Sequence, residues 1–123
     1  IKVVIDVHRD SILTDDGTAY KTSCTIDGEE MAQLMFVVGT DEGGLYHPDW
    51  QQNLNYVTGL QYQLNRAYPG LMRPVNLRTQ RFNQHASHGS MLIEVGSSGN
   101  TMPEALAAIR LFGQTLADDL NGA

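Results

Sequence analysis

The chain has 123 residues, and its eight lysines and arginines against fourteen aspartates and glutamates give a net charge of −6. This length suits one domain with a real hydrophobic core and leaves little room for two. A pI near 4.9 argues against non-specific binding of nucleic acid, which requires clustered cations. No apolar run approaches the ~20 residues that a membrane-spanning helix needs. The only cysteine, Cys24, has no partner for an internal disulfide or a cysteine-based zinc site.

The first predicted element is a strand over residues 1–7. Its near-continuous apolar run is typical of a strand that is covered on both faces. The run consists of Val3, Val4, Ile5 and Val7. Polar residues 8–11 follow directly, just past the carboxyl end of the strand, where ligands usually bind in open α/β sheets. A core strand this early also indicates that the sequence is part of a longer protein.

The middle of the chain predicts a hairpin and then a helix. Two β-rich runs, 19–26 and 31–38, are joined through Asp27-Gly28, a pair that favours a tight turn. An acidic loop over 39–44 leads to a helix over about 48–68, which begins at a proline and stops at Pro69-Gly70. Its predicted apolar stripe consists of Trp50, Leu54, Val57, Leu60, Leu64 and Ala67.

The last third of the chain predicts two strands and a second helix. A short strand is expected over 77–82 and a clearer one over 91–95. The helix begins after Thr101, whose hydroxyl can cap a backbone N–H while Glu104 reaches back to the threonine N–H. Its expected buried stripe is Met102, Leu106, Ile109, Phe112, Leu116 and Leu120. Strands that alternate with two long helices indicate one α/β domain over residues 1–123.

His8 and Glu94 are the residues most suited to chemistry. A neutral imidazole at the end of an apolar strand can bind zinc, or it can simply hydrogen-bond a loop. Glu94 lies inside a five-residue apolar run, where burial without a partner would raise its pKa and suit it to act as a general base near neutrality. The alternative is a structural ion pair with an arginine, and the sequence leaves both open. The candidate partners are Arg9, Arg73, Arg78 and Arg81.

The other polar candidates give weaker signals. His47 precedes a proline at the predicted helix start, and His85 and His88 lie three residues apart in a loop without helical metal-ligand spacing. These two are expected to line a cleft or to face solvent. Asn83 is a candidate for binding a substrate amide, although hydrogen bonds that fix loops are commoner for asparagine.

Several blocks of the sequence, in order and from the first strand to the last helix, resemble the stage II sporulation protein P family of peptidoglycan-cleaving amidases. The blocks are Ile5-Asp6-Val7-His8-Arg9-Asp10, then residues 36–41 and 44–50, and finally residues 81–85, 89–96 and 99–101.

The resemblance implies an α/β fold with a mixed sheet flanked by helices, of the phosphorylase/hydrolase-like kind seen in amidases. It implies a zinc-dependent N-acetylmuramoyl-L-alanine amidase, in which His8 corresponds to the last zinc ligand and Glu94 to the catalytic glutamate. For the complete protein, Arg9 and Asn83 are expected to stabilise the oxyanion, and Asn83 and His85 to shape the groove for glycan and peptide. The family is also associated with cutting peptide cross-links.

One departure from the family concerns zinc. The family's His-Thr-His motif and its glutamate ligand would lie before the first strand, so the fold is expected to be incomplete on its N-terminal side and the chain to lack two of three zinc ligands. This keeps two other functions open. One is a non-catalytic wall-binding or interaction module, and the other is a metal-free hydrolase that uses Glu94 with Asp10.

The family also implies a location and a partner. We expect an extracytoplasmic, membrane-anchored protein of the cell envelope that acts during spore engulfment. The anchor would lie outside this chain. Peptidoglycan is the expected substrate, and a second sporulation wall hydrolase, sporulation protein D, is the expected partner.

Overall fold

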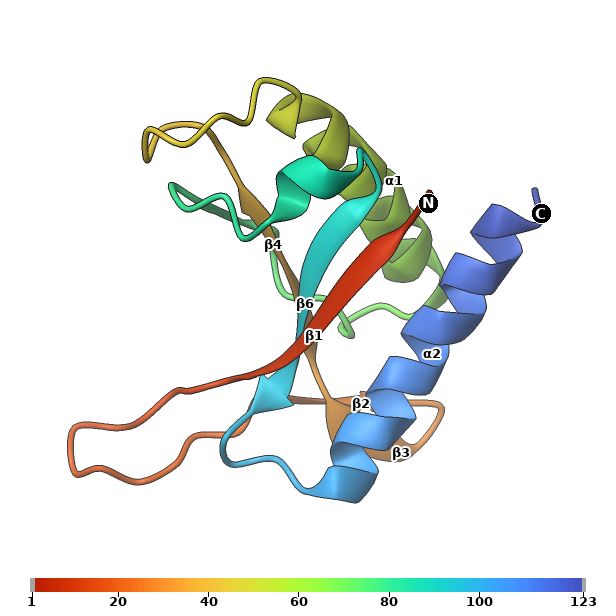
Figure 1. Ribbon diagram of the computed structural model, residues 1–123. Coiled ribbons are helices and arrows are strands. Elements are labelled where there is room, and N and C mark those ends of the chain that lie inside the picture. Colours follow the sequence, from red (N-terminus) through yellow and green to blue (C-terminus); the bar gives the residue numbers. More distant parts are fainter. Residues whose placement is uncertain (1, 123) are drawn as a thin grey trace.

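The computed structural model describes residues 2–122 and contains two sheets and two long helices (Figure 1). The elements in chain order are β1 (Val4–Asp10), β2 (Ser23–Ile26), β3 (Glu29–Ala32), β4 (Leu34–Gly39), α1 (Trp50–Ala67), β5 (Asn76–Arg78), the 3-10 turn η1 (Gln84–Ala86), β6 (Ser90–Ser97) and α2 (Met102–Leu120). The main sheet has the strand order β1-β6-β4-β5 and is mixed, because β4 and β6 are antiparallel while the β1–β6 and β4–β5 pairs are parallel. The predicted α/β class with a mixed sheet is confirmed.

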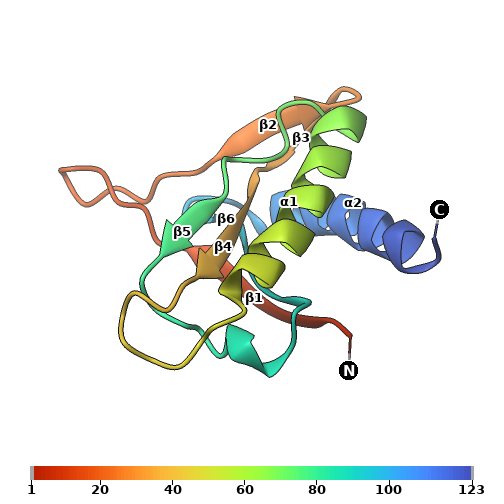
Figure 2. The same ribbon diagram turned by 90° about the horizontal axis from the view of Figure 1, so that it is seen from above.

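Both long helices cover the same face of this sheet (Figure 2). The alternation of side chains along the strands separates two apolar clusters. Phe36 and Ile93 belong to the larger cluster, which includes buried residues of α1 and α2. Met35, Val37 and Leu92 point to the other face, where Phe82 from a loop packs against them. Neither long helix covers this second face, on which Glu94 is half-buried although Met35, Val37 and Leu92 are buried.

The prediction that the first strand is covered on both faces is wrong. β1 is an edge strand that pairs only with β6 among the described strands. Its apolar residues are partly exposed, with Val4 38%, Ile5 37% and Val7 58% accessible. An apolar run alone predicts a strand but does not distinguish a central strand from an edge strand, because that depends on pairing with distant segments.

The hairpin is confirmed, although its second run divides. β2 and β3 pair through Asp27 and Gly28, which both have positive φ values, 50° and 81°. The run predicted as one strand over 31–38 breaks at Gln33, whose side-chain amide donates to the carbonyl of Gly70. After this break, the chain leaves the hairpin and enters the main sheet as β4.

The helices form where predicted, but their buried faces differ from the predicted stripes. In α1, Asn53 is buried, whereas Ala67 is exposed. In α2, Met102, Leu106 and Leu120 are 60%, 43% and 53% exposed. The helix instead packs on the sheet through a row of small residues and then larger ones. This buried row is Ala105, Ala107, Ala108, Phe112, Thr115 and Leu116.

Two shorter predictions have different outcomes. In place of the strand expected over 77–82, the structure has the shorter β5, which begins one residue earlier and ends at Arg78, whereas the strand expected over 91–95 lies within β6. No helix among the described residues has the length and apolar character needed to cross a membrane.

The start of α2 has the predicted capping box. The backbone N–H of Glu104 donates to Thr101 Oγ1 at 3.3 Å, and Glu104 Oε1 accepts from the backbone N–H of Thr101 at 2.8 Å.

We predict that Thr101→Ala lowers the free energy of unfolding by about 1 kcal/mol, because one backbone donor loses its acceptor. Urea unfolding followed by circular dichroism measures this. Thr58→Ala, an exposed threonine in the interior of α1, is the matched control and should change stability by much less. Equal losses in the two variants would contradict the capping role.

Candidate functional site

His8 and Glu94 lie side by side because β1 pairs with β6 in parallel register. His8 is the Cα partner of Glu94 in this ladder, and the two strands run together along the sheet (Figure 1). Glu94 is two residues from Leu92, so its side chain projects from the face that carries no helix. The predicted metal ligand His8, which is exposed, and the predicted catalytic glutamate Glu94, which is half-buried, are therefore neighbours on this face.

The Glu94 carboxylate has an unusual environment. Its Oε2 atom is buried and has no hydrogen-bond partner among residues 2–122. Burial raises the pKa of Glu94, and the negative charge of Asp10 raises it further, against the opposing effects of His8, Arg73 and Arg78. No residue in this described part of the chain forms an ion pair with Glu94, so the structural ion pair left open by the sequence is absent there. Because its pKa is raised, the Glu94 carboxyl group keeps its proton to a higher pH than an ordinary glutamate does.

Two further carboxylates of β1 flank His8, and each has a partner. Asp6 Oδ1 lies 2.8 Å from His8 Nε2. This contact holds the imidazole and leaves its other ring nitrogen for another partner, as in metal-binding histidines oriented by a carboxylate. Asp10 Oδ2 accepts from Arg73 Nη1 at 3.1 Å, beyond a register shift in the ladder between His8 and Asp10. Arg73 thus brings a positive charge to this end of the site.

Arg9 is not brought to the Glu94 carboxylate. Alternation along β1 directs its side chain to the face opposite to that of His8, and Nη1 donates to the carbonyl of Asn100 at 3.4 Å. The guanidinium groups close enough to lower the pKa of Glu94 are those of Arg78 and Arg73, which the sequence suggested only as ion-pair partners. Of these two, Arg73 also forms an ion pair with Asp10. Its approach depends on the segment after α1, where the backbone N–H of Arg73 donates to the carbonyl of Leu34.

Asn83 and His85 lie in the loop before β6, at its amino-terminal end. Asn83 is exposed and has a left-handed backbone with φ of 59°. His85 lines a hollow with His47 and His88 that does not include His8 or Glu94. Between them, Gln84 is buried: its amide nitrogen donates to the carbonyl of Val37 at 2.9 Å, and its oxygen accepts from the N–H of Gly39 at 2.9 Å. Sequence analysis missed Gln84, and only its place between two polar loop residues could have drawn attention to it.

The residues fit part of a zinc site but not a whole one. Among residues 2–122, no group of three or more histidine, cysteine, aspartate or glutamate side chains is arranged to hold a metal ion. His8 can provide one nitrogen, whereas catalytic zinc normally has three protein ligands. Neither His85 nor His88 completes the set, because both belong to the separate hollow.

Comparison with known proteins decides the family. A sequence model of the family stage II sporulation protein P (SpoIIP) matches residues 1–117. The chain belongs to the stage II sporulation protein P family. Membership in SpoIIP implies a role in sporulation, and the family is associated with peptidoglycan hydrolysis. No match was found among curated proteins or among solved structures.

The raised pKa of Glu94 predicts that this residue destabilises the fold at neutral pH. Below the ordinary carboxyl pKa, Glu94 is protonated in both the folded and unfolded chain and carries no penalty. As the pH rises, the unfolded chain releases this proton first, so stability falls until the pH exceeds the folded-state pKa. We predict that Glu94→Gln is more stable than the original chain at neutral pH, and that the difference disappears in acid.

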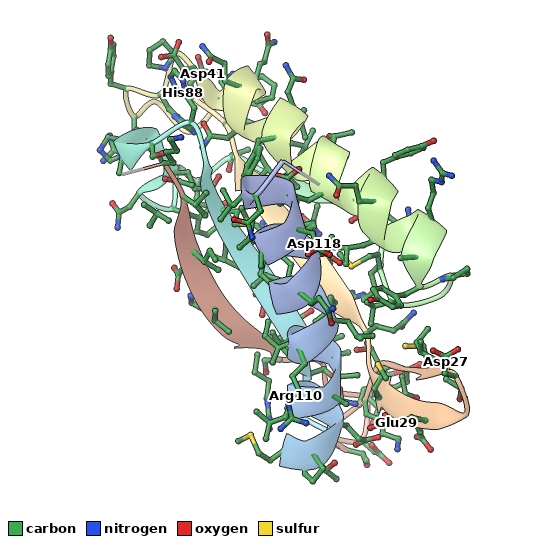
Figure 3. All side chains as sticks on the ribbon, turned by 90° about the vertical axis from the view of Figure 1, so that its right-hand side faces the viewer. Asp27, Glu29, Asp41, His88, Arg110 and Asp118 are labelled. Carbon is green, nitrogen blue, oxygen red and sulfur yellow. The ribbon has the colours of Figure 1, made fainter. Side chains whose placement is uncertain are left out.

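Urea unfolding between pH 4 and pH 8, a range that spans the ordinary carboxyl value, measures this difference. Glu29→Gln is the control, because Glu29 lies exposed on the hairpin (Figure 3). A pH-independent difference between Glu94→Gln and the original chain would show that Glu94 is not desolvated in the fold.

Proposed function

We propose that this chain carries the proton-transfer part of a peptidoglycan hydrolase that cleaves the amide between N-acetylmuramic acid and the L-alanine of the stem peptide. The observation that carries the proposal is the Glu94 carboxylate, which is partly buried, has no partner for one oxygen within residues 2–122, and lies beside the exposed His8. A general base that works near neutrality needs a pKa above that of an ordinary carboxyl group. Family membership supports the class of substrate.

The proposed chemistry is a hydrolysis with one water molecule. Glu94 takes a proton from this water as its oxygen attacks the amide carbonyl, which gives a tetrahedral intermediate. Glu94 then passes the proton to the departing nitrogen, the C–N bond breaks, and a carboxylic acid and a free amine result. The positive charge of Arg73, held by Asp10, favours the negative charge that develops on the carbonyl oxygen.

Substrate contacts away from the reacting bond are proposed for Asn83 and His85, both exposed in the loop before β6. The contact of Arg9 with the carbonyl of Asn100 favours a structural role for this residue over contact with substrate.

We propose zinc as the cofactor, with His8 as one ligand and the remaining ligands from residues other than those described. Zinc would supply a water molecule whose pKa is lowered to about 7. The Asp6–His8 contact supports this role, since carboxylates commonly orient histidines that bind metal.

The proposed setting follows from the family. In the longer protein, a membrane anchor would hold the domain outside the cytoplasm, in the cell envelope. Sporulation protein D would act on the same wall as a partner hydrolase.

The first test concerns Glu94. In the full-length protein, Glu94→Gln should lower the rate of wall digestion by 10²–10⁴-fold, because the proton acceptor is lost. Glu29→Gln should digest at the normal rate. Mass spectrometry of the products distinguishes a stem peptide with a free L-alanine amine from cut cross-links. Normal digestion by Glu94→Gln would remove this residue from the mechanism, and cut cross-links alone would replace the amidase with an endopeptidase.

The second test concerns zinc. Exhaustive chelation of the full-length protein should abolish digestion and zinc should restore it, while His8→Ala should weaken zinc binding measured by calorimetry. Activity that survives chelation would favour the metal-free hydrolase, although Arg73 already engages the Asp10 that it would need.

A non-catalytic wall-binding module is the second candidate, favoured by the absence of a three-ligand group among residues 2–122. Sedimentation of the chain with purified peptidoglycan tests it. Saturable binding that neither chelator nor His8→Ala changes would support the module, if the full-length protein also lacks hydrolytic activity.

A further inference from the structure

The sheet face that carries Glu94 also carries an arginine at its far edge. β5 is the edge strand next to β4 (Figure 2), and Arg78 is the Cα partner of Gly39 in their parallel ladder. Two residues earlier, Asn76 is paired with Val37, which belongs to the apolar cluster on the Glu94 face. Because side chains alternate along a strand and partners in a ladder share a face, Arg78 and Asn76 both project from this face.

Arg78 is a cation of this face that has no acidic partner. Arg73 is held by Asp10, whereas Arg78 is exposed and forms no ion pair with any of residues 2–122. Asp41 and Glu42 border the same hollow of about 400 Å³ as Arg78 but do not pair with it. The guanidinium group of Arg78 is therefore free to bind an anion from outside the chain.

The position of Arg78 relative to Glu94 follows from the two ladders that β4 forms. Glu94 is paired with Met35, and Arg78 is paired with Gly39, four residues further along β4. Two strand spacings across the sheet, about 10 Å, and four residues along it, about 13 Å, place the two Cα atoms roughly 16 Å apart. An extended peptide of about five residues spans this distance. The positive charge of Arg78 is also close enough to lower the pKa of Glu94.

We propose that Arg78 binds a carboxylate of the stem peptide while the amide to be cut lies at Glu94. The N–H groups of a guanidinium form a planar fork that matches the two oxygens of a carboxylate, and such charge-assisted pairs are stronger than hydrogen bonds between neutral groups. This assignment rests on the proposed wall substrate and adds a determinant of its specificity. The protein should prefer walls whose peptides carry free carboxylates over walls in which these groups are amidated.

NMR titration of the Glu94→Gln chain tests this contact without hydrolysis. The probe is N-acetyl-L-alanyl-γ-D-glutamyl-L-alanine, which should shift the side-chain Nε–H signal of Arg78 at millimolar concentration. The same peptide with both carboxylates amidated should leave the signal unchanged. Inorganic phosphate distinguishes a site for any anion from a site for the peptide. Shifts of equal size with phosphate or with the amidated peptide, or no shift with the free acid, would overturn the proposal.

Substitutions of Arg78 in the same Glu94→Gln background separate charge from geometry. Arg78→Gln should weaken binding of the free acid by at least about tenfold, because a charged hydrogen-bond donor is lost. Arg78→Lys keeps the charge without the fork, and its affinity should lie between the two. Arg110→Gln is the matched control, since Arg110 is exposed on α2 (Figure 3) and this helix covers the opposite face of the sheet. Unchanged binding by Arg78→Gln would refute the assignment.

Digestion by the full-length protein tests the same contact on the wall itself. Amidation of the wall carboxylates should raise KM and leave kcat unchanged, and Arg78→Gln should digest both kinds of wall with the same high KM. A preference for free carboxylates that persists in Arg78→Gln would show that another residue reads them. Because peptide binding at Arg78 is measured without the Glu94 carboxylate, its outcome is distinct from a failure of the proposed hydrolysis.

Discussion

Parallel pairing between β1 and β6 is the constraint on which the candidate site depends. β1 has no second partner strand in the described sheet, so its hydrogen bonds to β6 alone determine which of its side chains share a face with Glu94. A slip by one residue would turn His8 towards α2 and replace it by Val7 or Arg9. Between His8 and Asp10 the pairing of β1 with β6 shifts by one residue, so that Asp10 lies opposite Ser97. The relative positions of His8 and Glu94 therefore depend on the register of two strands and not on the conformation of a loop.

Buried amide side chains hold the loops around this sheet in place. Gln84 bonds both to the carbonyl of Val37 and to the N–H of Gly39, and Asn53 bonds three carbonyls of the segment that leads into β6. At the other end of β6, the Asn100 side chain accepts from the N–H of Ser97 and donates to the carbonyl of Thr22. Each bond satisfies a backbone group that would otherwise be buried without a partner. The loops are thus ordered through polar contacts where no apolar core is available.

The sequence predicted local features well and long-range partners poorly. Asp27-Gly28 and the Thr101–Glu104 box are encoded by neighbouring residues, so the turn and the helix start followed directly. The neighbouring positions of His8 and Glu94 were also anticipated, as a consequence of strand ends and family resemblance. The exposure of Val7 was not anticipated, because the burial of a strand depends on which distant segments cover it. The position of Arg73 depends on a contact across more than sixty residues, which no local pattern records.

Two glutamates ten positions apart show why the environment, and not the residue type, selects the candidate base. Glu104 accepts from the backbone N–H of Thr101 and lies near Lys21, and these donors lower its pKa to about 2. Glu94 lies within β6, where the neighbouring backbone N–H groups are committed to the sheet and Asp10 adds a negative charge. A carboxylate satisfied by donors gives up its proton readily and serves structure. One that is desolvated without donors holds a proton more tightly, and this property is the reason that we propose Glu94, and not Glu104, for proton transfer.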